Sequence, residues 1–417
     1  MARFCGWFVL VMLFSVVARG EDWPQWRGPT RDGVYRGRSW PESLDEKTLV
    51  QAWRVELEPS YSGPIVYGKR VFTTETVKAD KERVTAYDRE TGEQLWQTEW
   101  KGSLIVPFFA WANGSWIRAT PACDGETLYV AGIRDVLVAL DVETGKERWR
   151  VDFVEKCKTP VPSFGFVASP LIDGESIYVQ AAAAVVKLNK RTGEIEWREF
   201  KDERGMNGSA FSSPIITNVG EVRQLVVQSR EKLAGLTLNE GKVLWSQEVP
   251  AFRGMNIITP TIVGDLAFAS TYGGKTNGYR IANKSESKDE PRFEVETTWT
   301  EPSQGYMSSP VVIDGHAYVH LRNQRFACFN LVEGKRTWVT EPFGKYWNLV
   351  TRQDRILALD EKGELLLIAA DPKEFKLLSR RKVSSDSAWA HMGIADGKLF
   401  IRELNALTVW NWKSKVN

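Results

Sequence analysis

Side chains that could take part in catalysis or metal binding are scarce in this sequence. Only 3 His and 4 Cys occur among 417 residues, which leaves little material for a zinc site or a disulfide framework. His316 and His320 would share one face of a helix, but their turn-and-strand context spoils that geometry. Nucleophile-elbow, P-loop and dinucleotide-binding motifs are absent from the sequence. We therefore predict neither a metal site nor catalytic residues.

A second set of side chains is suited to binding. Aromatic rings, Arg and amides recur in the segments that join successive repeats of the chain, and together they suit a flat ligand or a peptide segment. The alternative is that these side chains pack on one another and cap a channel. The predicted ligand or partner residues are Trp111, Trp116, Arg118, Phe166, Arg253, Asn256, Tyr306, Trp347 and His391.

The cysteines leave two interpretations open. Cys5 falls in a leader segment, so Cys123, Cys157 and Cys328 remain. In an oxidising compartment an odd number means at least one free thiol or a pairing with a partner. A Cys123–Cys157 bridge and three buried thiols that act as small hydrophobes both fit the sequence.

An internal repeat predicts the elements that position these side chains. Five segments share one pattern, with a Gly four residues before a Trp, and each is flanked by apolar residues that indicate strand–turn–strand. Gly suits a turn position with positive φ. The five copies are residues 86–96, 139–149, 187–197, 235–245 and 328–338.

A proline marks the start of most repeats. Six prolines follow a small residue, at 64, 121, 170, 214, 260 and 310, and successive ones are 44 to 57 residues apart. Four-stranded propeller blades repeat at about 40–50 residues. Two further copies without the proline, 349–357 and 392–400, bring the number of repeats to eight. We predict an all-β, eight-bladed β-propeller.

The last repeat lacks its fourth strand, because the chain ends shortly after residue 412. Residues 50–57 resemble a Trp-bearing outer strand and have no strand partners of their own, so we expect this N-terminal strand to close the ring. Indoles at equivalent outer-strand positions are expected to pack between blades as structural residues. They are Trp53, Trp96, Trp149, Trp197, Trp245, Trp299 and Trp338.

The first twenty residues have the features of a signal peptide. Arg3 precedes an apolar run over residues 4–17, and Ala18-Arg19-Gly20 supplies small residues for cleavage. The alternative, a retained membrane anchor, is disfavoured because a span needs roughly 20 apolar residues. We predict a signal peptide at 1–20, an N-terminal extension at 21–49, and one propeller over 50–417 that is periplasmic or secreted.

Charge narrows the choice of partner. Lys and Arg number 55 against 53 Asp and Glu, a formal net charge of +2, so no basic field favours nucleic acid. We expect a monomer without a transmembrane segment after signal removal. Its partner is expected to be a protein, a small molecule or a glycan at the channel face.

The motifs resemble a known family. The Gly-Glu/Lys-x-x-Trp turns and the Ser/Thr-Pro blade openings resemble the pyrroloquinoline quinone (PQQ) repeat. The stretch DWPQWRGPTRDG at 22–33 is similar to the N-terminus of exported PQQ-binding-like propeller proteins. The resemblance covers residues 22–412 and implies a quinoprotein-alcohol-dehydrogenase-like propeller. That fold serves both dehydrogenases and scaffolds, such as the propeller lipoprotein of outer-membrane protein assembly.

The resemblance leaves the activity open. Dehydrogenases of this family hold PQQ with a calcium ion and a carboxylate base, and many carry two adjacent Cys, a pair that this sequence lacks. Our first hypothesis is a non-catalytic exported binding scaffold without a cofactor. The alternatives are a PQQ- and calcium-dependent oxidoreductase and a propeller that binds carbohydrate or cell surfaces.

Overall fold

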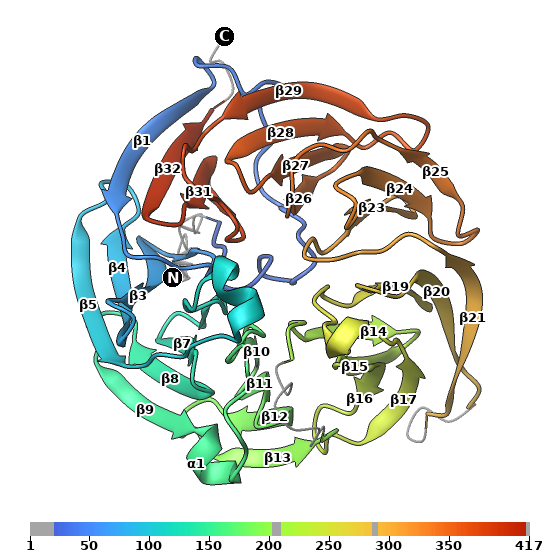
Figure 1. Ribbon diagram of the computed structural model, residues 1–417, viewed down its shortest axis with the longest axis horizontal. Coiled ribbons are helices and arrows are strands. Elements are labelled where there is room, and N and C mark those ends of the chain that lie inside the picture. Colours follow the sequence, from blue (N-terminus) through green and yellow to red (C-terminus); the bar gives the residue numbers. More distant parts are fainter. Residues whose placement is uncertain (1–20, 202–209, 286–290, 414–417) are drawn as a thin grey trace, which may run out of the picture.

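Eight four-stranded antiparallel sheets form a closed ring, as the repeat predicted (Figure 1). The computed structural model describes residues 21–201, 210–285 and 291–413. The predicted signal peptide therefore lies outside the described residues. Each blade is a meander whose first strand is nearest the centre of the ring and whose fourth is at the periphery.

The strands of the first four blades are as follows. Blade 1 contains β2 (Ile65–Tyr67), β3 (Arg70–Val77), β4 (Lys81–Asp88) and β5 (Gln94–Lys101). Blade 2 contains β6 (Ala122–Cys123), β7 (Thr127–Gly132), β8 (Val136–Asp141) and β9 (Glu147–Asp152). Blade 3 contains β10 (Leu171–Asp173), β11 (Ser176–Ala181), β12 (Ala184–Asn189) and β13 (Ile195–Glu199). Blade 4 contains β14 (Ile215–Val219), β15 (Val222–Gln228), β16 (Lys232–Leu236) and β17 (Val243–Glu248).

The other four blades repeat this order. Blade 5 contains β18 (Thr261–Val263), β19 (Leu266–Ser270), β20 (Thr276–Asn283) and β21 (Phe293–Glu301). Blade 6 contains β22 (Val311–Ile313), β23 (His316–His320), β24 (Phe326–Asn330) and β25 (Arg336–Val339). Blade 7 contains β26 (Asn348–Arg352), β27 (Arg355–Leu359), β28 (Glu364–Ala369) and β29 (Lys376–Lys382). Blade 8 contains β30 (Gly393–Ala395), β31 (Lys398–Arg402), β32 (Ala406–Trp412) and β1 (Leu49–Glu56).

The N-terminal strand closes the ring. β1 pairs antiparallel with β32, with Val55 opposite Leu407, and it forms the outer edge of blade 8. The short helices η1 (Phe108–Asn113), α1 (Phe153–Cys157) and η3 (Phe252–Gly254) lie in the connections between blades. The expectation that residues 50–57 complete the last blade is therefore confirmed.

The repeated Trp and Gly form one contact between neighbouring blades. Trp53 of blade 8 lies on Gly92 of blade 1, and a Cβ on that Gly would come within 2.8 Å of the indole. Gly92 also has φ +76°, a region that L side chains rarely adopt. The same contact joins Trp96 to Gly145, Trp149 to Gly193, Trp197 to Gly241 and Trp299 to Gly334. The glycine thus serves both the turn and the packing of the previous blade.

The indole N–H groups add a hydrogen bond to this contact. Trp149 Nε1 donates to the Lys190 carbonyl of the next blade at 3.1 Å, and five of the other blade Trp residues do the same across their own junctions. Trp245 is the exception, because its Nε1 donates to Gln224 within blade 4. Its ring still packs in a core cluster with Tyr279 and Ile281 of blade 5.

The residue before each opening proline links the blades around the channel. The Gly63 N–H donates to the Thr120 hydroxyl, and the Thr120 N–H donates to Ser169. Ser169 N–H in turn donates to Ser213, and Thr259 N–H donates to Ser309. Because the hydroxyl accepts a bond from the preceding blade, Ser or Thr at this position stabilises the inner ring.

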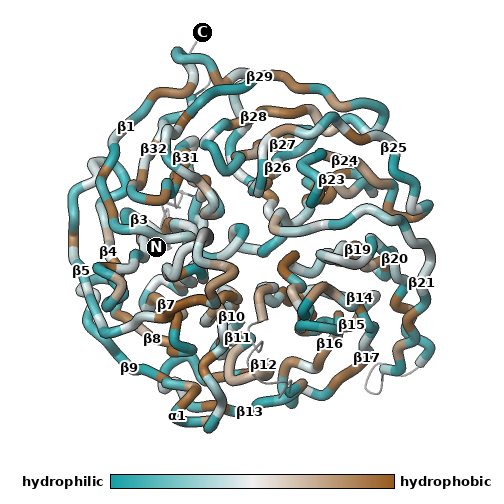
Figure 2. Tube along the Cα trace, viewed as in Figure 1, coloured by the Kyte–Doolittle hydropathy of each residue, from teal (hydrophilic) through white to brown (hydrophobic). Residues whose placement is uncertain are grey.

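Apolar side chains fill the blades. Figure 2 shows hydrophobic and hydrophilic residues alternating along outer strands such as β21, as expected for strands with one solvent-exposed face. Inner strands such as β7 and β27 are buried almost throughout. The clusters join adjacent blades: Phe268 of blade 5, for example, packs with Phe329 of blade 6.

Residues 21–36 cross the ring and close one end of its channel, a role that sequence reasoning did not foresee (Figure 1). Trp23 pairs with Val66 of blade 1 and is 2% exposed. Arg31 donates to the Ser169 and Pro170 carbonyls of blade 3, and Arg27 donates to the Pro310 carbonyl of blade 6. The segment thus ties opposite sides of the ring together.

The thiols do not pair. Cys123, Cys157 and Cys328 are all free, so the Cys123–Cys157 bridge that the sequence left open does not form. Burial raises the pKa of Cys123 to about 12, which keeps its thiol protonated and unreactive. Within residues 21–201, 210–285 and 291–413, no helix has the length and apolar character of a bilayer span.

Candidate functional site

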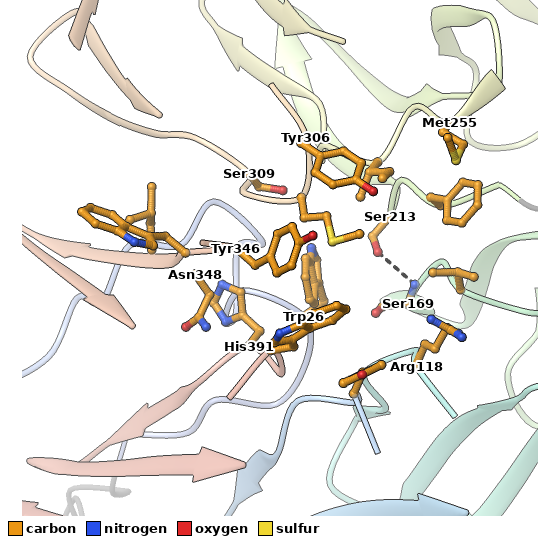
Figure 3. A pocket seen from close by; sticks show the side chains of 18 of the residues that line it. Trp26, Arg118, Ser169, Ser213, Met255, Tyr306, Ser309, Tyr346, Asn348 and His391 are labelled. Carbon is orange, nitrogen blue, oxygen red and sulfur yellow. Dashed lines mark hydrogen bonds between the residues drawn. The ribbon is translucent and has the colours of Figure 1, made fainter. Parts of the chain in front are cut away.

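A cavity of about 190 Å³ lies in the channel, above the N-terminal segment (Figure 3). All eight connections between blades contribute to its walls, and Trp26 of the N-terminal segment also lines it. Its aromatic and Met residues are Trp26, Tyr61, Phe164, Phe211, Met255, Tyr306, Met307, Tyr346, Trp347 and Trp389. Its polar residues are Arg118, Ser169, Ser213, Ser309, Asn348 and His391. Val167, Ile257 and Leu349 complete it.

Rings in contact with one another form an aromatic arc around the cavity. Tyr61 stacks on Trp389, with centroids 4.7 Å apart and planes 18° apart, and Trp389 meets the edge of Tyr346 at 4.5 Å. Tyr346 contacts Tyr306 at 5.8 Å, and Tyr306 contacts Tyr272 at 4.7 Å. These contacts hold the rings in place, so the aromatic wall is formed before any ligand arrives.

Within ranges 21–201, 210–285 and 291–413, Arg118 is the one cationic side chain in the lining. One terminal nitrogen donates to the Gly114 carbonyl, while Nε has no hydrogen-bond partner in the part of the chain that the structure describes. The guanidinium also lies 5.8 Å from the centroid of Tyr61. Removal from water lowers the pKa of Arg118 to about 10, so it remains charged at neutral pH.

His391 contributes a neutral imidazole. Burial, followed by the nearby Arg27, lowers the pKa of His391 to about 3. Its Nδ1 lies 3.0 Å from the Met392 carbonyl, and its ring packs on Trp26 at 4.9 Å. A general base at neutral pH needs a pKa near 7, so His391 is suited to packing and hydrogen bonding.

Four of the predicted binding residues line the cavity: Arg118, Tyr306, Trp347 and His391. Trp347 is only 1% exposed, because it stacks on His320 at 4.7 Å and packs against Phe326 and Phe343. Trp347 therefore mainly packs behind the wall of the cavity, and little of its ring is exposed to the cavity itself. Replacing it would leave a hole in the core of blades 6 and 7, so it is unsuited to a test of binding.

Three more predicted residues lie outside the lining, in connections between blades that contribute other residues to it. Trp116 meets Tyr61 edge-on at 5.1 Å. Trp111 is 65% exposed at the end of η1. Arg253 lies over the rings of Phe109 and Phe252, at 5.0 and 5.2 Å from their centroids.

Phe166 and Asn256 lie away from the cavity. Phe166 is buried against Phe153 in the core of blades 2 and 3. The amide of Asn256 donates to the carbonyls of Ser229, Arg230 and Val249. In the sequence both residues lie in connections between blades, as the other predicted binding residues do. Alternate residues of such a connection face opposite sides, so these two point away from the cavity.

Several lining residues were missing from the predicted set. Trp26 belongs to the N-terminal motif. Because this motif has no counterpart in the repeat, the repeat pattern does not predict that Trp26 lines the cavity. Ser169, Ser213 and Ser309 precede opening prolines, and this position, once read as channel-facing, would have revealed them. Tyr61 and Trp389 lie in the connections on either side of blade 8 and were recognisable as aromatic connection residues.

The donor set does not fit PQQ with calcium. Calcium takes six to eight oxygen ligands, among them carboxylates, and no Asp or Glu is among the described residues that line the cavity. Among the described residues there is also no group of three His, Cys, Asp or Glu that could hold a metal ion. The described lining offers rings, hydroxyls, one amide and one guanidinium, which bind and orient a ligand but supply no carboxylate base.

A family model described as outer membrane protein assembly factor BamB matches residues 42–110 and 80–340. The protein belongs to this PQQ-repeat family. The match spans the Gly-x-x-x-Trp units of blades 1 to 4 and 6 and the opening prolines of blades 1 to 6, which are the elements that pack the blades and surround the cavity.

Curated relatives of this PQQ-repeat protein are distant. Outer membrane protein assembly factor BamB of Yersinia pestis is 26% identical over 269 residues, which are 60% of this chain and 63% of the relative. BamB of Moranella endobia is 24% identical over 310 residues, 72% of this chain and 64% of the relative. The chain thus spans slightly less than two thirds of these relatives.

Solved structures show the same fold. BamB from Moraxella catarrhalis superimposes with a TM-score of 0.63 at 16% identity, covering 88% of this chain and 99% of that chain. A europium-containing methanol dehydrogenase gives a TM-score of 0.63 at 11% identity, covering 94% of this chain and 98% of that chain. The same propeller fold therefore occurs in BamB and in a dehydrogenase, so function has to be argued from the side chains of the cavity and not from the fold.

Proposed function

We propose that this protein is an exported, non-catalytic binding propeller that holds a segment of another polypeptide in its channel cavity during outer-membrane protein assembly. The observation that carries the proposal is the lining of the cavity. Of the residues that the structure describes, rings, hydroxyls and one guanidinium surround it, and no carboxylate is among them.

The fixed aromatic arc supports binding of an apolar chain. Aromatic and Met side chains are enriched at binding surfaces, because rings supply large contact area at low conformational cost and the flexible Met side chain adapts to different partners. Tyr306 and Tyr346 also carry hydroxyls that can bond to a peptide backbone. The names of the Yersinia and Moranella relatives indicate the cellular process in which such a segment would be met.

The exposed apolar side chains beside the cavity support a partner larger than a metabolite. Phe108 is 77% exposed and Phe109 54% exposed, on the helix η1 at the channel mouth. Phe109 contacts Phe164, which lines the cavity, so the apolar surface runs continuously from rim to wall. Contiguous exposed apolar surface is typical of protein-binding sites.

Site-specific photo-crosslinking tests the proposal. A photoreactive phenylalanine analogue replaces Tyr306 in the cavity, and in a matched variant it replaces Glu194, an exposed turn residue at the outer edge of blade 3. With an unfolded outer-membrane β-barrel polypeptide, we expect crosslinks from position 306 and few from position 194. Equal yields at both positions would contradict the proposal, as would dye-linked oxidation of alcohols by protein reconstituted with PQQ and calcium.

A further inference from the structure

We propose that the cavity selects an apolar or aromatic group that is joined to a single carboxylate, with the carboxylate against Arg118. This chemistry occurs at the C-terminal residue of a polypeptide and in a free aromatic acid. The inference rests on the proposed function, since it specifies which part of a polypeptide the cavity holds.

Three Arg side chains at the channel carry positive charge that no salt bridge among the described residues compensates. Arg118 lines the cavity, and Arg27 and Arg31 are buried in the N-terminal segment beside it. Across the described ranges 21–201, 210–285 and 291–413, none of the three forms a salt bridge. Arg27 and Arg31 bond instead to backbone carbonyls.

Two acidic side chains outside the cavity lining, Glu361 and Asp386, act on Tyr61, and Glu361 is already paired with Lys345 at 3.9 Å. Asp32 acts on Arg27, but its carboxylate is already paired with Arg36 at 2.6 Å. Buried charges are costly unless they are paired. An anionic group in the cavity would provide the missing compensation.

The bonding of Arg118 leaves room for such a group. Its hydrogen bond to Gly114 uses one terminal nitrogen, while Nε is buried and, among the described residues, unbonded. A guanidinium binds a carboxylate through two adjacent N–H groups. Arg118 therefore retains donors for a ligand that enters the cavity.

The serine hydroxyls extend the donor set. Ser169 and Ser213 accept hydrogen bonds from the backbone N–H groups of Thr120 and Ser169, respectively. A hydroxyl that accepts in this way still has its own proton to donate. Figure 3 shows Ser169 and Ser213 near Arg118 at one side of the cavity.

The size and the walls of the cavity indicate which group is attached to the carboxylate of the ligand. A volume of about 190 Å³ is below the roughly 300–1,000 Å³ of pockets for drug-sized ligands, so it suits a single ring or an apolar side chain. Tyr306, Met307 and Trp389 provide contact surface for that group. The apolar rim at Phe108 and Phe109 offers a path for preceding residues of a peptide.

Calorimetric titration of the full protein with three probes tests the inference. The probes are a pentapeptide that ends in Phe with a free carboxylate, the same peptide with an amidated C-terminus, and 3-phenylpropionate. We expect the free peptide to bind at least tenfold more tightly than the amide. Equal affinity of the two peptides would overturn the inference and leave the proposed function standing, whereas binding of none of the three probes would overturn the inference.

The same titration identifies the source of the carboxylate. Binding of the free peptide more tightly than 3-phenylpropionate would assign the cavity to a polypeptide C-terminus. Equal or tighter binding of 3-phenylpropionate would assign it to a free aromatic acid and would support the same chemistry. The crosslinking from position 306 reports separately on whether a polypeptide enters the cavity at all.

Variants assign the selectivity to Arg118. In R118Q the preference for the free peptide over the amide should fall to about one, while the affinity for the amide stays unchanged. R118K, which keeps the charge, should retain part of the preference and shows whether loss of binding reflects misfolding. R191Q removes an Arg that is paired with Glu175 at the outer edge of blade 3 and should behave as wild type. An undiminished preference in folded R118Q would contradict the inference.

Discussion

Glu82 is a titratable residue whose carboxyl group the closed blades bury away from water. Its two carboxylate oxygens accept hydrogen bonds from the Ile133 N–H at 2.6 Å and the Trp100 indole at 2.7 Å. Gly102 and Gly132 leave the space, since a Cβ on either would come within 2.6 Å of the carboxylate. Burial nevertheless raises the pKa of Glu82 to about 7, because the hydrogen bonds do not offset the loss of water.

This shift predicts a pH dependence of stability. The folded state holds the proton of Glu82 more tightly than the unfolded state, whose ordinary pKa is 4.5. Raising the pH above 4.5 and through 7 therefore favours unfolding. Because E82Q does not titrate, its free energy of unfolding relative to wild type should rise by about 3 kcal/mol between pH 4.5 and 8. Denaturant unfolding at several pH values measures this difference.

A matched comparison excludes other titrating groups. His320 and His391 have lowered pKa values and act on stability in the opposite direction over part of this range. Both residues are present in wild type and in E82Q, so their effects cancel in the difference. A difference that stays constant with pH would show that Glu82 is solvated or already ionised in the folded state.

The junction between neighbouring blades is built from one repeated contact. An outer-strand Trp of one blade covers the turn Gly of the next and donates its indole N–H to a carbonyl there. This combination explains why the Trp and Gly keep a fixed spacing in five copies of the sequence. Blades 5 and 7 both lack that Gly in their third hairpin: blade 5 receives Trp245 without the hydrogen bond, whereas blade 7 accepts it from Trp338 at the Asp371 carbonyl.

Loss of one such indole should be costly. Trp149→Ala removes the packing on Gly193 and the hydrogen bond to Lys190, and we expect a loss of about 3–5 kcal/mol in the free energy of unfolding. Trp111→Ala removes an indole of the same size that is 65% exposed, and it should change stability by less than about 0.5 kcal/mol. Equal denaturant midpoints for the two variants would contradict the structural role of Trp149.

Sequence alone predicted the blades better than the site. The period, the turn Gly and the outer Trp recur, and each follows from local geometry, so the fold and its closure by residues 50–57 could be derived. The cavity depends on which side of each connection faces the channel. Phe166 and Asn256 look like Tyr306 in sequence but point into the blades. Trp26 could not be placed at all, because no repeat relates its segment to the ring.

At the scale of the whole molecule, the N-terminus has two separate tasks. β1 completes blade 8, and residues 21–36 cross the channel and form one wall of the cavity. A ring of blades is stable only when its last edge is paired, because an open edge exposes unpaired backbone groups and the facing core. The crossing segment adds ties between blades that are not neighbours.

Two truncations separate these tasks. A chain that begins at residue 58 lacks β1, and we expect aggregation or a markedly lower Tm, since the edge of β32 is exposed. A chain that begins at residue 37 keeps β1 and should stay monomeric with a smaller fall in Tm, while its cavity loses Trp26. Thermal unfolding and size-exclusion chromatography distinguish the two. Equal stability of the chain from residue 58 and the full protein would refute closure by β1.

Hydrogen–deuterium exchange of the full protein, with and without an unfolded outer-membrane β-barrel polypeptide, tests whether the cavity holds a polypeptide segment. If the cavity holds a polypeptide segment, backbone amides around Arg118, Tyr306, Tyr346 and Trp389 should exchange more slowly in the complex. Those of the outer strands β13 and β17 should be unchanged. Slower exchange on the outer strands alone, with no change in the connections around the cavity, would show that the cavity does not hold the polypeptide.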